Sequence, residues 1–519
     1  MSKRIGIAAV IWGVSVLLSR VIGVVRESVI GRVLGGGGEA DVYWTAFVLP
    51  DFLNYLLAGG ALSIVFIPMF AGYLSRGDEA GGWRVFSTIA NFVLVVLGIA
   101  TAVLWWLAPE IVPTLAPGFS PEQLEHLTRL TRIVLPAQLF HLIGGLLSAS
   151  LQARDKHALP ALATLGYTGT IVIMGLALGP TWGADAFAWG VLVGSAIGPF
   201  GLPLIGCIHQ SLGEGSFGWR PILDLKSPDF KRYLWLSLPI MLAFSIVVID
   251  DWLLKRYGSL VGEGTVSRLQ YAKTLMKVPM GVFGLATGAA AYPTLSRLAA
   301  EGKTVEAYDT LVRACRLMLV LAFASQAAFT VAGADVAEVI WGTERFTAQH
   351  LDEIGLYTGL FCLALGAWSA NTLVARGYYA QQLTWMPSLI GSVMVVVFWP
   401  VYRLAGLHMG GTGLALASSA AVSTYVVVLS AVLRRKMAGP TSPALWTLVV
   451  RMLPSVAAGV GAGRALDGVI DLPALVQGSL TGGLALVVTL LVARLLGVPE
   501  VAEVVALVLG KLRRKLGLK

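Results

Sequence analysis

The second half of this chain repeats the residue spacing of its first half. Five positions recur after a shift of about 225 residues. The matched positions are Pro68 with Pro293, Gly77 with Gly302, Trp83 with Tyr308, Ser120 with Thr347, and Pro160 with Pro387. A spacing that is kept over such a distance indicates a duplicated unit of about six membrane helices. Because transporters are commonly built from two such repeats around a site near the bilayer midplane, the duplication favours a transport function.

Long apolar stretches recur along the whole sequence and exclude a water-soluble globule. Of the 519 residues, 56% are apolar and only 13% are charged, and the mean hydropathy is +0.77. A helix needs about 20 apolar residues to cross the roughly 30 Å hydrocarbon core of a bilayer, and windows of that length occur from end to end. Segments of alternating apolar and polar residues, which are typical of membrane strands, do not recur in the sequence. We therefore expect an all-α integral membrane protein.

The apolar windows predict about fourteen transmembrane helices. They arrange as two pseudo-equivalent six-helix lobes, 1–222 and 223–437, followed by two C-terminal helices in 438–498 and a basic amphipathic tail in 499–519. The expected spans are 5–26, 42–73, 84–108, 129–153, 158–180, 184–210, 232–257, 264–298, 308–333, 351–380, 384–404, 410–433, 443–464 and 473–496. The tail alternates apolar and basic residues, which is typical of a helix lying on the cytoplasmic leaflet.

Basic and acidic residues separate between the two sets of loops. Loops expected inside contain Lys3, Arg4, Arg76, Arg84, Arg154, Lys156, Arg220, Lys226, Lys231, Arg232, Arg297, Lys303, Arg434, Arg435 and Lys436. Loops expected outside contain Glu39, Asp41, Glu110, Glu122, Glu125, Glu263, Asp335, Glu338 and Glu344. Because short cytoplasmic loops collect Lys and Arg, both termini are predicted to be cytoplasmic. The basic loops that give the net charge of +9 then lie against anionic membrane lipids, and no nucleic-acid partner is needed to explain this charge.

The sequence carries no signature of an enzyme. Cys207, Cys315 and Cys362 lie far apart within apolar spans and form no CxxC or Cys/His set, so packing is their expected role. A Walker lysine loop, a GxSxG and an HExxH are missing, which leaves ATP hydrolysis and peptidase chemistry without support. We expect a transporter without covalent chemistry and without a cofactor, whose coupling ion, sodium or a proton, is left open.

Several short segments of the chain form recognisable motifs. In the first half they are Ser19–Glu27, Glu39–Tyr43 and Gly59–Pro68. In the second half they are Tyr271–Ala272, Val278–Gly284, Tyr292–Ser296, Arg345–Thr347 and Gly377–Ala380. The first group resembles the N-terminal signature of the MurJ (MviN) family, and the second resembles its eighth helix and the flanks of its tenth. The likeness covers about residues 5–435. Members of this family are lipid II flippases of the MOP exporter superfamily in the bacterial inner membrane, with two helices C-terminal to the repeats.

The resemblance implies a V-shaped transporter with a cationic central cavity for the diphosphate and sugars of lipid II, and a groove for the polyprenyl tail along the last two helices. Arg20 and Arg26 stand where the family has its helix 1 arginines. Asn54 stands at the helix 2 position where the family usually has a cavity arginine. Lys273 and Thr274 stand where it commonly has an acidic and then a basic residue. The expected substrate-binding residues are Arg20, Arg26, Asp41, Asn54 and Lys273.

Helix geometry places several of these residues deep in the membrane. Lys273 is expected about 14 Å, and Asn54 about 18 Å, below the outer ends of their helices. A diphosphate crosses hydrocarbon only if its charge is paired, and arginine pairs it through a bidentate fork. Because an ammonium near the midplane cannot easily reach the interface, a water-filled cavity is favoured over snorkelling for Lys273.

Arg20 and Arg26 are expected about 24 Å and about 33 Å along the first span from Arg4, so Arg20 is the deeper of the two. Arg26 lies near the outer edge, where pairing with Glu27 or Asp41 is an alternative to contact with a ligand.

Two adjacent carboxylates lie in the expected seventh span. Asp250 and Asp251 precede Lys255 and Arg256, and a local ion-pair cluster near the outer interface would account for all four. Alternatively, Asp250 and Asn371 would belong to a cation site that couples transport to an ion gradient, because hard oxygen ligands suit such a cation.

The sequence and the resemblance together predict a flippase that moves an undecaprenyl-diphosphate-linked glycan, lipid II, from the inner to the outer leaflet by alternating access. A flippase for another polyprenyl-linked oligosaccharide, such as an O-antigen or exopolysaccharide unit, is the first alternative. A multidrug cation antiporter of the same superfamily is a less favoured alternative, because such a transporter should have an anionic cavity. A nontransporting member that scaffolds cell-wall synthesis proteins at the membrane is an alternative of a different class.

Overall fold

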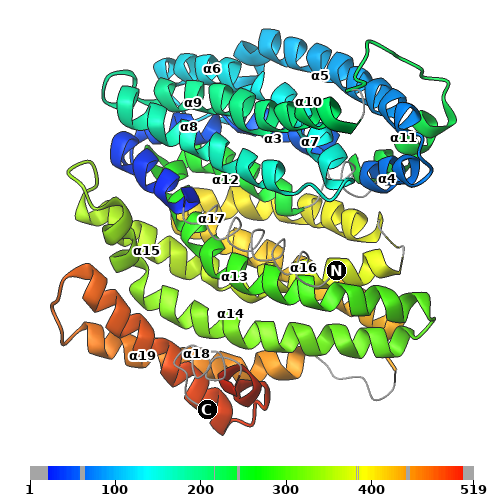
Figure 1. Ribbon diagram of the computed structural model, residues 1–519. Helices are drawn as coiled ribbons and strands as arrows, with labels where there is room; N and C mark the ends of the chain where they lie inside the picture. Colours follow the sequence, from blue (N-terminus) through cyan, green and yellow to red (C-terminus); the bar gives the residue numbers. More distant parts are fainter. Residues whose placement is uncertain are drawn as a thin grey trace. The chain divides into compact units, whose positions relative to one another are not determined.

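Figure 1 shows the computed structural model, in which all the described secondary structure is helical. The structure describes residues 22–58, 65–214, 217–241, 246–381, 383, 385–439 and 445–506. Contacts between residues divide the chain into two compact units, Met1–Ala243 and Phe244–Lys519.

Unit 1 opens with a helix over residues 22–34. Its further helices are α2 (Gly38–Thr45), α3 (Val48–Ala58), α4 (Ile67–Ser75), α5 (Glu79–Leu115), α6 (Pro121–Val134), α7 (Ala137–Gln152), α8 (Ala158–Trp182), α9 (Ala184–Ser195), α10 (Leu202–Glu214) and α11 (Pro228–Met241), with a π-helical turn at Ala196–Gly201. Helices α6 and α7 together form one candidate span, and α9 continues through the π-helical turn into α10 as another.

Helix α6 begins at a strong capping signal. The side chain of Ser120 accepts a hydrogen bond from the backbone of Gln123 at 3.2 Å, and the Gln123 side chain accepts one from the backbone of Ser120 at 3.0 Å. Farther along α6, Arg129 and His126 contact the Asp185 carboxylate at 2.6 Å and 3.0 Å. Because Asp185 lies in the first turn of α9, these contacts hold the beginnings of α6 and α9 together.

The described part of unit 2 contains eight longer helices and a helical stretch at 500–506. The longer helices are α12 (Ile246–Val261), α13 (Thr265–Ala300), α14 (Thr304–Trp341), α15 (Ala348–Cys362), α16 (Leu365–Ala380), α17 (Trp385–Met437), α18 (Leu445–Asp467) and α19 (Ala474–Leu495). Helices α15 and α16 meet at a 43° bend. Helix α17 consists of two helices joined at Gly410, whose φ is +60°. Helices α18 and α19 pack against each other and against α14, as the lower part of Figure 1 shows.

Backbone turns recur in the two units at the spacing that the sequence predicted. Gly77 and Gly302 have φ values of +73° and +72° and are followed by long helices, α5 of 37 residues and α14 of 38 residues. Gly183 and Gly410 form a second pair, with φ values of +55° and +60°. Because residues with a Cβ atom rarely adopt these conformations, matched glycines mark equivalent positions. The predicted duplication is therefore visible in the backbone.

Helix starts recur as well. Thr347 caps α15 by accepting a hydrogen bond from the backbone of His350 at 3.2 Å, as Ser120 caps α6. Both caps are followed by a helix pair that is broken at an equivalent place, α6 with α7 and α15 with α16.

The multi-pass, all-α architecture is confirmed. Eight described helices are long and apolar enough to cross a membrane, and the bent pair of α15 and α16 raises this number to nine. The expected number of about fourteen spans stays a prediction, because most of the first expected span and the break between α11 and α12 lie outside the described residues.

The two units divide after Ala243, whereas the sequence analysis placed the lobe boundary after residue 222. Helix α11 accounts for the difference, because its first turn is attached to unit 1. Tyr73 donates a hydrogen bond to Asp229 at 2.5 Å, and the Phe92 and Phe230 rings pack edge to face at 4.9 Å. The expected lobe boundary between residues 222 and 223 stays a prediction, because a division by contacts does not test which helices belong to each repeat.

The described beginning of the C-terminal tail is held by unit 2. Arg316 of α14 forms an ion pair with Glu500, and Arg313 pairs with Glu503 at 3.3 Å. All the basic residues that predicted an interfacial helix lie in 507–519, outside the described residues.

Candidate functional site

Two neighbouring helices of unit 2 bring three charged side chains together. Lys273 lies about 12 Å along α13 from its start at Thr265, and Asp250 lies about 17 Å before the end of α12 at Val261. Residues 262–264 connect the two helices. Because the connection is so short, side chains at similar distances from it can meet.

The Lys273 ammonium is enclosed by carboxylates. Its Nζ atom donates hydrogen bonds to Oδ2 of Asp250 and to Oδ1 of Asp251. The side chains of Lys273 and Asp250 are 1% and 0% exposed, whereas that of Asp251 is 41% exposed. One ammonium faces two carboxylates, so the fully ionised cluster carries one net negative charge. Asp251 is the member of the cluster whose side chain is exposed.

Two aromatic residues from other helices complete the cluster. The buried hydroxyl of Tyr402 in α17 donates a hydrogen bond to Oδ1 of Asp250, so both oxygens of this carboxylate are engaged. The Lys273 Nζ atom lies 5.3 Å from the centroid of the Trp368 ring in α16, where the ring quadrupole attracts the ammonium. Helices α12, α13, α16 and α17 therefore each contribute to holding one buried ammonium.

This geometry differs from the expected surroundings of Lys273. We expected a water-filled cavity, but in this conformation the ammonium is buried and paired. From the sequence, the two aspartates are expected to pair with Lys255 and Arg256. The structure adds Lys273 as their direct partner, while Lys255 and Lys277 interact with Asp251 through their charges. The role of Lys273 in substrate binding stays a prediction, and it requires the ammonium to exchange partners.

Asn371 lies in α16 one helical turn after Trp368. Among the described residues, the buried Oδ1 atom of Asn371 has no hydrogen-bond partner. In the same part of the chain, no three His, Cys, Asp or Glu side chains come together as a metal site. A coupling-cation site made of Asp250 and Asn371 stays a prediction, because Lys273 and Tyr402 engage both Asp250 oxygens here.

Arg26 of unit 1 pairs with its neighbour. Its guanidinium donates a hydrogen bond to Glu27 at 2.5 Å, and its side chain remains 29% exposed. Tyr43 and Tyr167 are near enough to interact with its charge. Pairing with Glu27, one alternative considered from the sequence, is thus present. The remaining exposure of the side chain is compatible with contact to a ligand as well.

The remaining predicted residues are spread over unit 1. Asp41 is fully buried in α2, and Asn54 is partly exposed in α3. Arg20 lies outside the described residues. The structure brings Lys273 and Asp250 together in unit 2, while Arg26, Asp41 and Asn54 occupy three different helices of unit 1.

Sequence reasoning missed Tyr402 and Trp368, which both contact the charged cluster. Neither residue stands in a motif, and each is one of several aromatic residues in its helix. The available signal was the pair Asp250 and Lys273, which lie at similar distances from the α12 to α13 connection. A buried charge pair needs polar or aromatic neighbours, but the sequence does not tell which helix supplies them.

Comparison with known proteins points in one direction. The family described as "Lipid II flippase MurJ" matches residues 30–468 of this chain. A "Probable lipid II flippase MurJ" of Rhizobium tropici is 27% identical over 433 residues, which cover 82% of this chain and 80% of the relative. A "Lipid II flippase MurJ" of Burkholderia cenocepacia is 28% identical over 418 residues, which cover 78% of this chain and 80% of the relative.

Solved structures share the fold. A structure described as "Lipid II flippase MurJ, inward closed conformation" has a TM-score of 0.75 at 20% identity and covers 92% of this chain and 98% of that chain. An inward-facing multidrug resistance MATE family transporter of the MOP superfamily has a TM-score of 0.59 at 14% identity and covers 83% of this chain and 98% of that one. At these identities the likeness concerns the fold alone.

Proposed function

This chain belongs to the lipid II flippase MurJ family, and on that premise we propose that it carries lipid II across the bacterial inner membrane. It is a multi-pass transporter of the MOP type and performs no covalent chemistry. The observation that carries this proposal is the extent of the family match, since residues 30–468 include most of both units. Both halves of the duplicated architecture thus belong to the transport machinery.

Transport requires that the lipid II diphosphate always has cationic partners while it is inside the membrane. We assign this role to Arg20 and Arg26 of the first repeat and Lys273 of the second, in an inward-open state. The lobes then rock and expose the headgroup outside. Moving one charge through the membrane potential is worth about 2.3 kcal/mol per 100 mV, which gives the cycle a direction.

The cluster around Lys273 makes this exchange chemically reasonable. Asp250 and Asp251 occupy the ammonium in the described conformation, as a diphosphate would in the loaded state. The 41% exposure of Asp251 supplies the route by which an incoming anion replaces this carboxylate first. A coupling cation, sodium or a proton, at Asp250 and Asn371 would take over Asp250 when Lys273 turns to the substrate. No cofactor enters the cycle.

The polyprenyl tail needs an apolar path outside the charged cavity. We assign it to the surface of the C-terminal helices, where a groove of about 460 Å³ lies between α14 and α19. Gly478 and Gly482 let α19 pack closely against Asp335 and Ala332 of α14, and Val339 and Leu486 line the groove above this contact. The apolar lining suits an isoprenoid chain.

The direct experiment is a lipid II flipping assay in cells depleted of their own flippase and rescued by this chain. Lipid II should reappear on the outer face, and lysis should be prevented. Continued lysis, with restored surface polysaccharide in a strain that lacks an oligosaccharide flippase, would identify the alternative substrate. Asn54, at the position where the family usually has an arginine, is the observation that favours testing this alternative.

A nontransporting scaffold would behave differently. A variant that lacks the charges of Arg20, Arg26 and Lys273 should fail to rescue depleted cells if the chain transports lipid II. Full rescue by that variant would instead support a role in binding cell-wall synthesis proteins. Export of cationic dyes by expressing cells would support a multidrug antiporter.

A further inference from the structure

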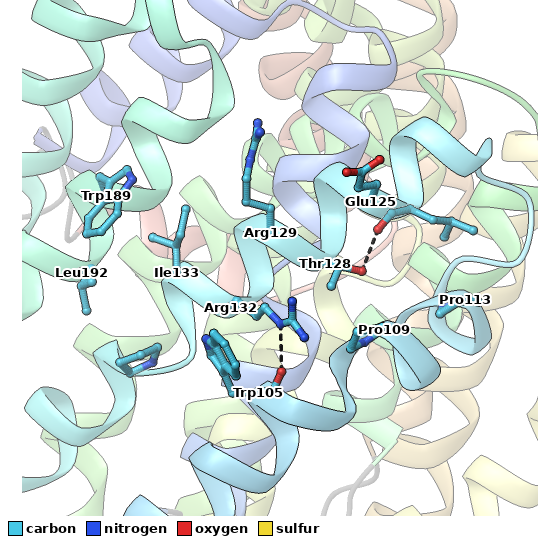
Figure 2. Close-up of a pocket in the computed structure, with 12 residues that line it drawn as sticks. Trp105, Pro109, Pro113, Glu125, Thr128, Arg129, Arg132, Ile133, Trp189 and Leu192 are labelled. Atoms are coloured by element: carbon cyan, nitrogen blue, oxygen red, sulfur yellow. Dashed lines mark hydrogen bonds between the residues drawn. The ribbon is translucent and has the colours of Figure 1, made fainter.

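Unit 1 contains a groove of about 820 Å³ between α5, α6 and α9, apart from the residues assigned to lipid II. Figure 2 shows its lining side chains. Trp105 and Pro109 of α5 and Trp189 and Leu192 of α9 supply aromatic and apolar walls. Tryptophan is enriched where a helix passes from hydrocarbon to headgroups, so these walls are typical of a membrane interface.

Helix α6 contributes a row of charges to this groove. Glu125, Arg129 and Arg132 all line it and follow one another at intervals of four and three residues, which places them on one helix face. The row is about 10 Å long. Because α6 starts at the loop around Ser120 and continues through α7 across the membrane, Glu125 lies nearest to water and Arg132 lies deepest.

Arg132 is oriented by α5 in a way that leaves part of its guanidinium available. Its Nε atom donates a hydrogen bond to the backbone oxygen of Trp105 at 2.9 Å, and the guanidinium lies 4.4 Å from the centroid of the Trp105 ring. Figure 2 shows this contact at the edge of the groove. Within the described residues no hydrogen bond engages its two Nη groups, so they are available to an anion, and a planar, pre-oriented guanidinium binds phosphate well.

Arg129 adds a second donor group one turn closer to water. Its Nη2 atom pairs with Asp185 at 2.6 Å, and its side chain is 62% exposed. In Figure 2 Arg129 and Glu125 extend from the same helix as Arg132, and Glu125 lies nearer the start of α6. Along α6 the groove therefore presents, from the water side inward, a carboxylate and two guanidinium groups, and α5 and α9 supply its apolar walls.

We propose that this groove binds a glycerophospholipid with an ethanolamine headgroup. In such a lipid the ammonium is outermost, the phosphate follows, and the acyl chains are deepest. The ammonium and the phosphate match the order of Glu125, then Arg129 and Arg132, along α6, and the acyl chains match the apolar walls that include Trp189 and Leu192. Phosphatidylglycerol has no ammonium for Glu125, and the choline ammonium has no N–H group to donate. The proposal does not depend on the identity of the transported substrate.

The test is native mass spectrometry of the full-length, delipidated protein with added dioleoyl phosphatidylethanolamine or dioleoyl phosphatidylglycerol. Wild type should bind the ethanolamine lipid at least about tenfold more tightly, the size expected for one charge-assisted hydrogen bond. Glu125→Gln should remove this preference while phosphatidylglycerol affinity persists. Arg132→Gln should weaken both lipids by about tenfold or more. Arg132→Lys keeps the charge but loses the bidentate geometry of the guanidinium, so its affinity for both lipids should lie between those of wild type and Arg132→Gln.

Two variants are matched controls. Glu122→Gln removes an exposed carboxylate from the same helix outside the groove, and Arg76→Gln removes a guanidinium that stacks on Tyr73 at 4.7 Å. Both should bind the two lipids like wild type. Equal affinity of wild type for both lipids, or the same loss in Glu122→Gln as in Glu125→Gln, would overturn the proposal. Displacement of the ethanolamine lipid by undecaprenyl diphosphate at equal concentration would instead assign the groove to the substrate.

Discussion

The Lys273 ammonium is held by two carboxylates of α12 and lies over the Trp368 ring of α16. The Tyr402 hydroxyl of α17 donates a hydrogen bond to one of these carboxylates, that of Asp250. At this depth each charge depends on its partners, because an unpaired buried charge is costly in a membrane. The same dependence makes Lys273 suitable for transport, since its ammonium can pass from one anion to another without being left unpaired.

Replacing Lys273 by Ala should lower the free energy of unfolding by about 3–5 kcal/mol, because Asp250 is then buried without a cation. Chemical denaturation in detergent, monitored by circular dichroism, measures this change. The exposed loop residue Lys303 provides the control, and Lys303→Ala should leave stability unchanged. A Lys273→Ala protein as stable as wild type would show that the cluster is hydrated or neutral.

The structural and transport roles of Lys273 can be separated with a charge-neutral cluster. The triple variant Asp250→Asn, Asp251→Asn, Lys273→Met leaves neither a lone ammonium nor a lone carboxylate among these three residues, so it should regain most of the stability that Lys273→Ala loses. It should still fail to translocate lipid II, because the ammonium is gone. Flipping assays and denaturation curves on the same preparations decide between the two roles, and a triple variant that transports normally would exclude Lys273 from the substrate path.

Tyr402→Phe should lower the free energy of unfolding by about 1–3 kcal/mol, because Oδ1 of Asp250 loses its buried hydrogen-bond donor. A double-mutant cycle with Asp250→Asn isolates the pair. The coupling should exceed about 0.5 kcal/mol, the limit within which separate sites usually add. Simple additivity would mean that Tyr402 packs beside Asp250 without stabilising its charge.

At the scale of helices, the sharp turns at Gly183 and Gly410 are equivalent points of the two repeats. Alanine should destabilise both sites by about 1–3 kcal/mol, because both backbones have positive φ. The loss should be larger at Gly183, where a Cβ atom would lie 1.9 Å from Glu39, than at Gly410, whose nearest atom, in Val261, is 3.3 Å away. Thermal unfolding compares these variants.

Gly98→Ala is the matched control for the two turn glycines. Gly98 lies inside α5, and a Cβ atom there would meet no atom within 4 Å. Alanine should be neutral or stabilising by up to about 1 kcal/mol at this site, because glycine lowers helix propensity. The same loss at Gly98 as at Gly183 would contradict the assigned turn geometry.

The sequence predicted the helices better than their contacts. The shift between Ser120 and Thr347, and between Gly77 and Gly302, identified repeated helix starts and turns because capping and positive φ depend on local residue type. The contacts of Lys273 are harder to predict from the sequence. Asp250 lies on the preceding helix and Tyr402 is more than a hundred residues away, so the contacts among these three residues depend on how four helices pack. The division after Ala243 likewise depends on the contacts of α11 with unit 1.

For the whole molecule, the charge distribution predicts an orientation that labelling can test. In a cysteine-free background, Glu122→Cys should react with a membrane-impermeant maleimide in intact cells, because its loop is expected outside. Lys303→Cys should react only after the membrane is opened. Both side chains are exposed, so accessibility from one side reports topology rather than burial. The reverse pattern would place the termini outside and invert the direction of transport.

The central claim is that Lys273 exchanges its carboxylate partners for the diphosphate of lipid II while lipid II crosses the membrane. The most direct measurement is the rate at which lipid II appears on the outer face of depleted cells that carry either wild type or the charge-neutral triple variant at equal abundance. We predict rapid appearance with wild type and no rescue with the folded variant. Equal rates in the two strains would contradict the account.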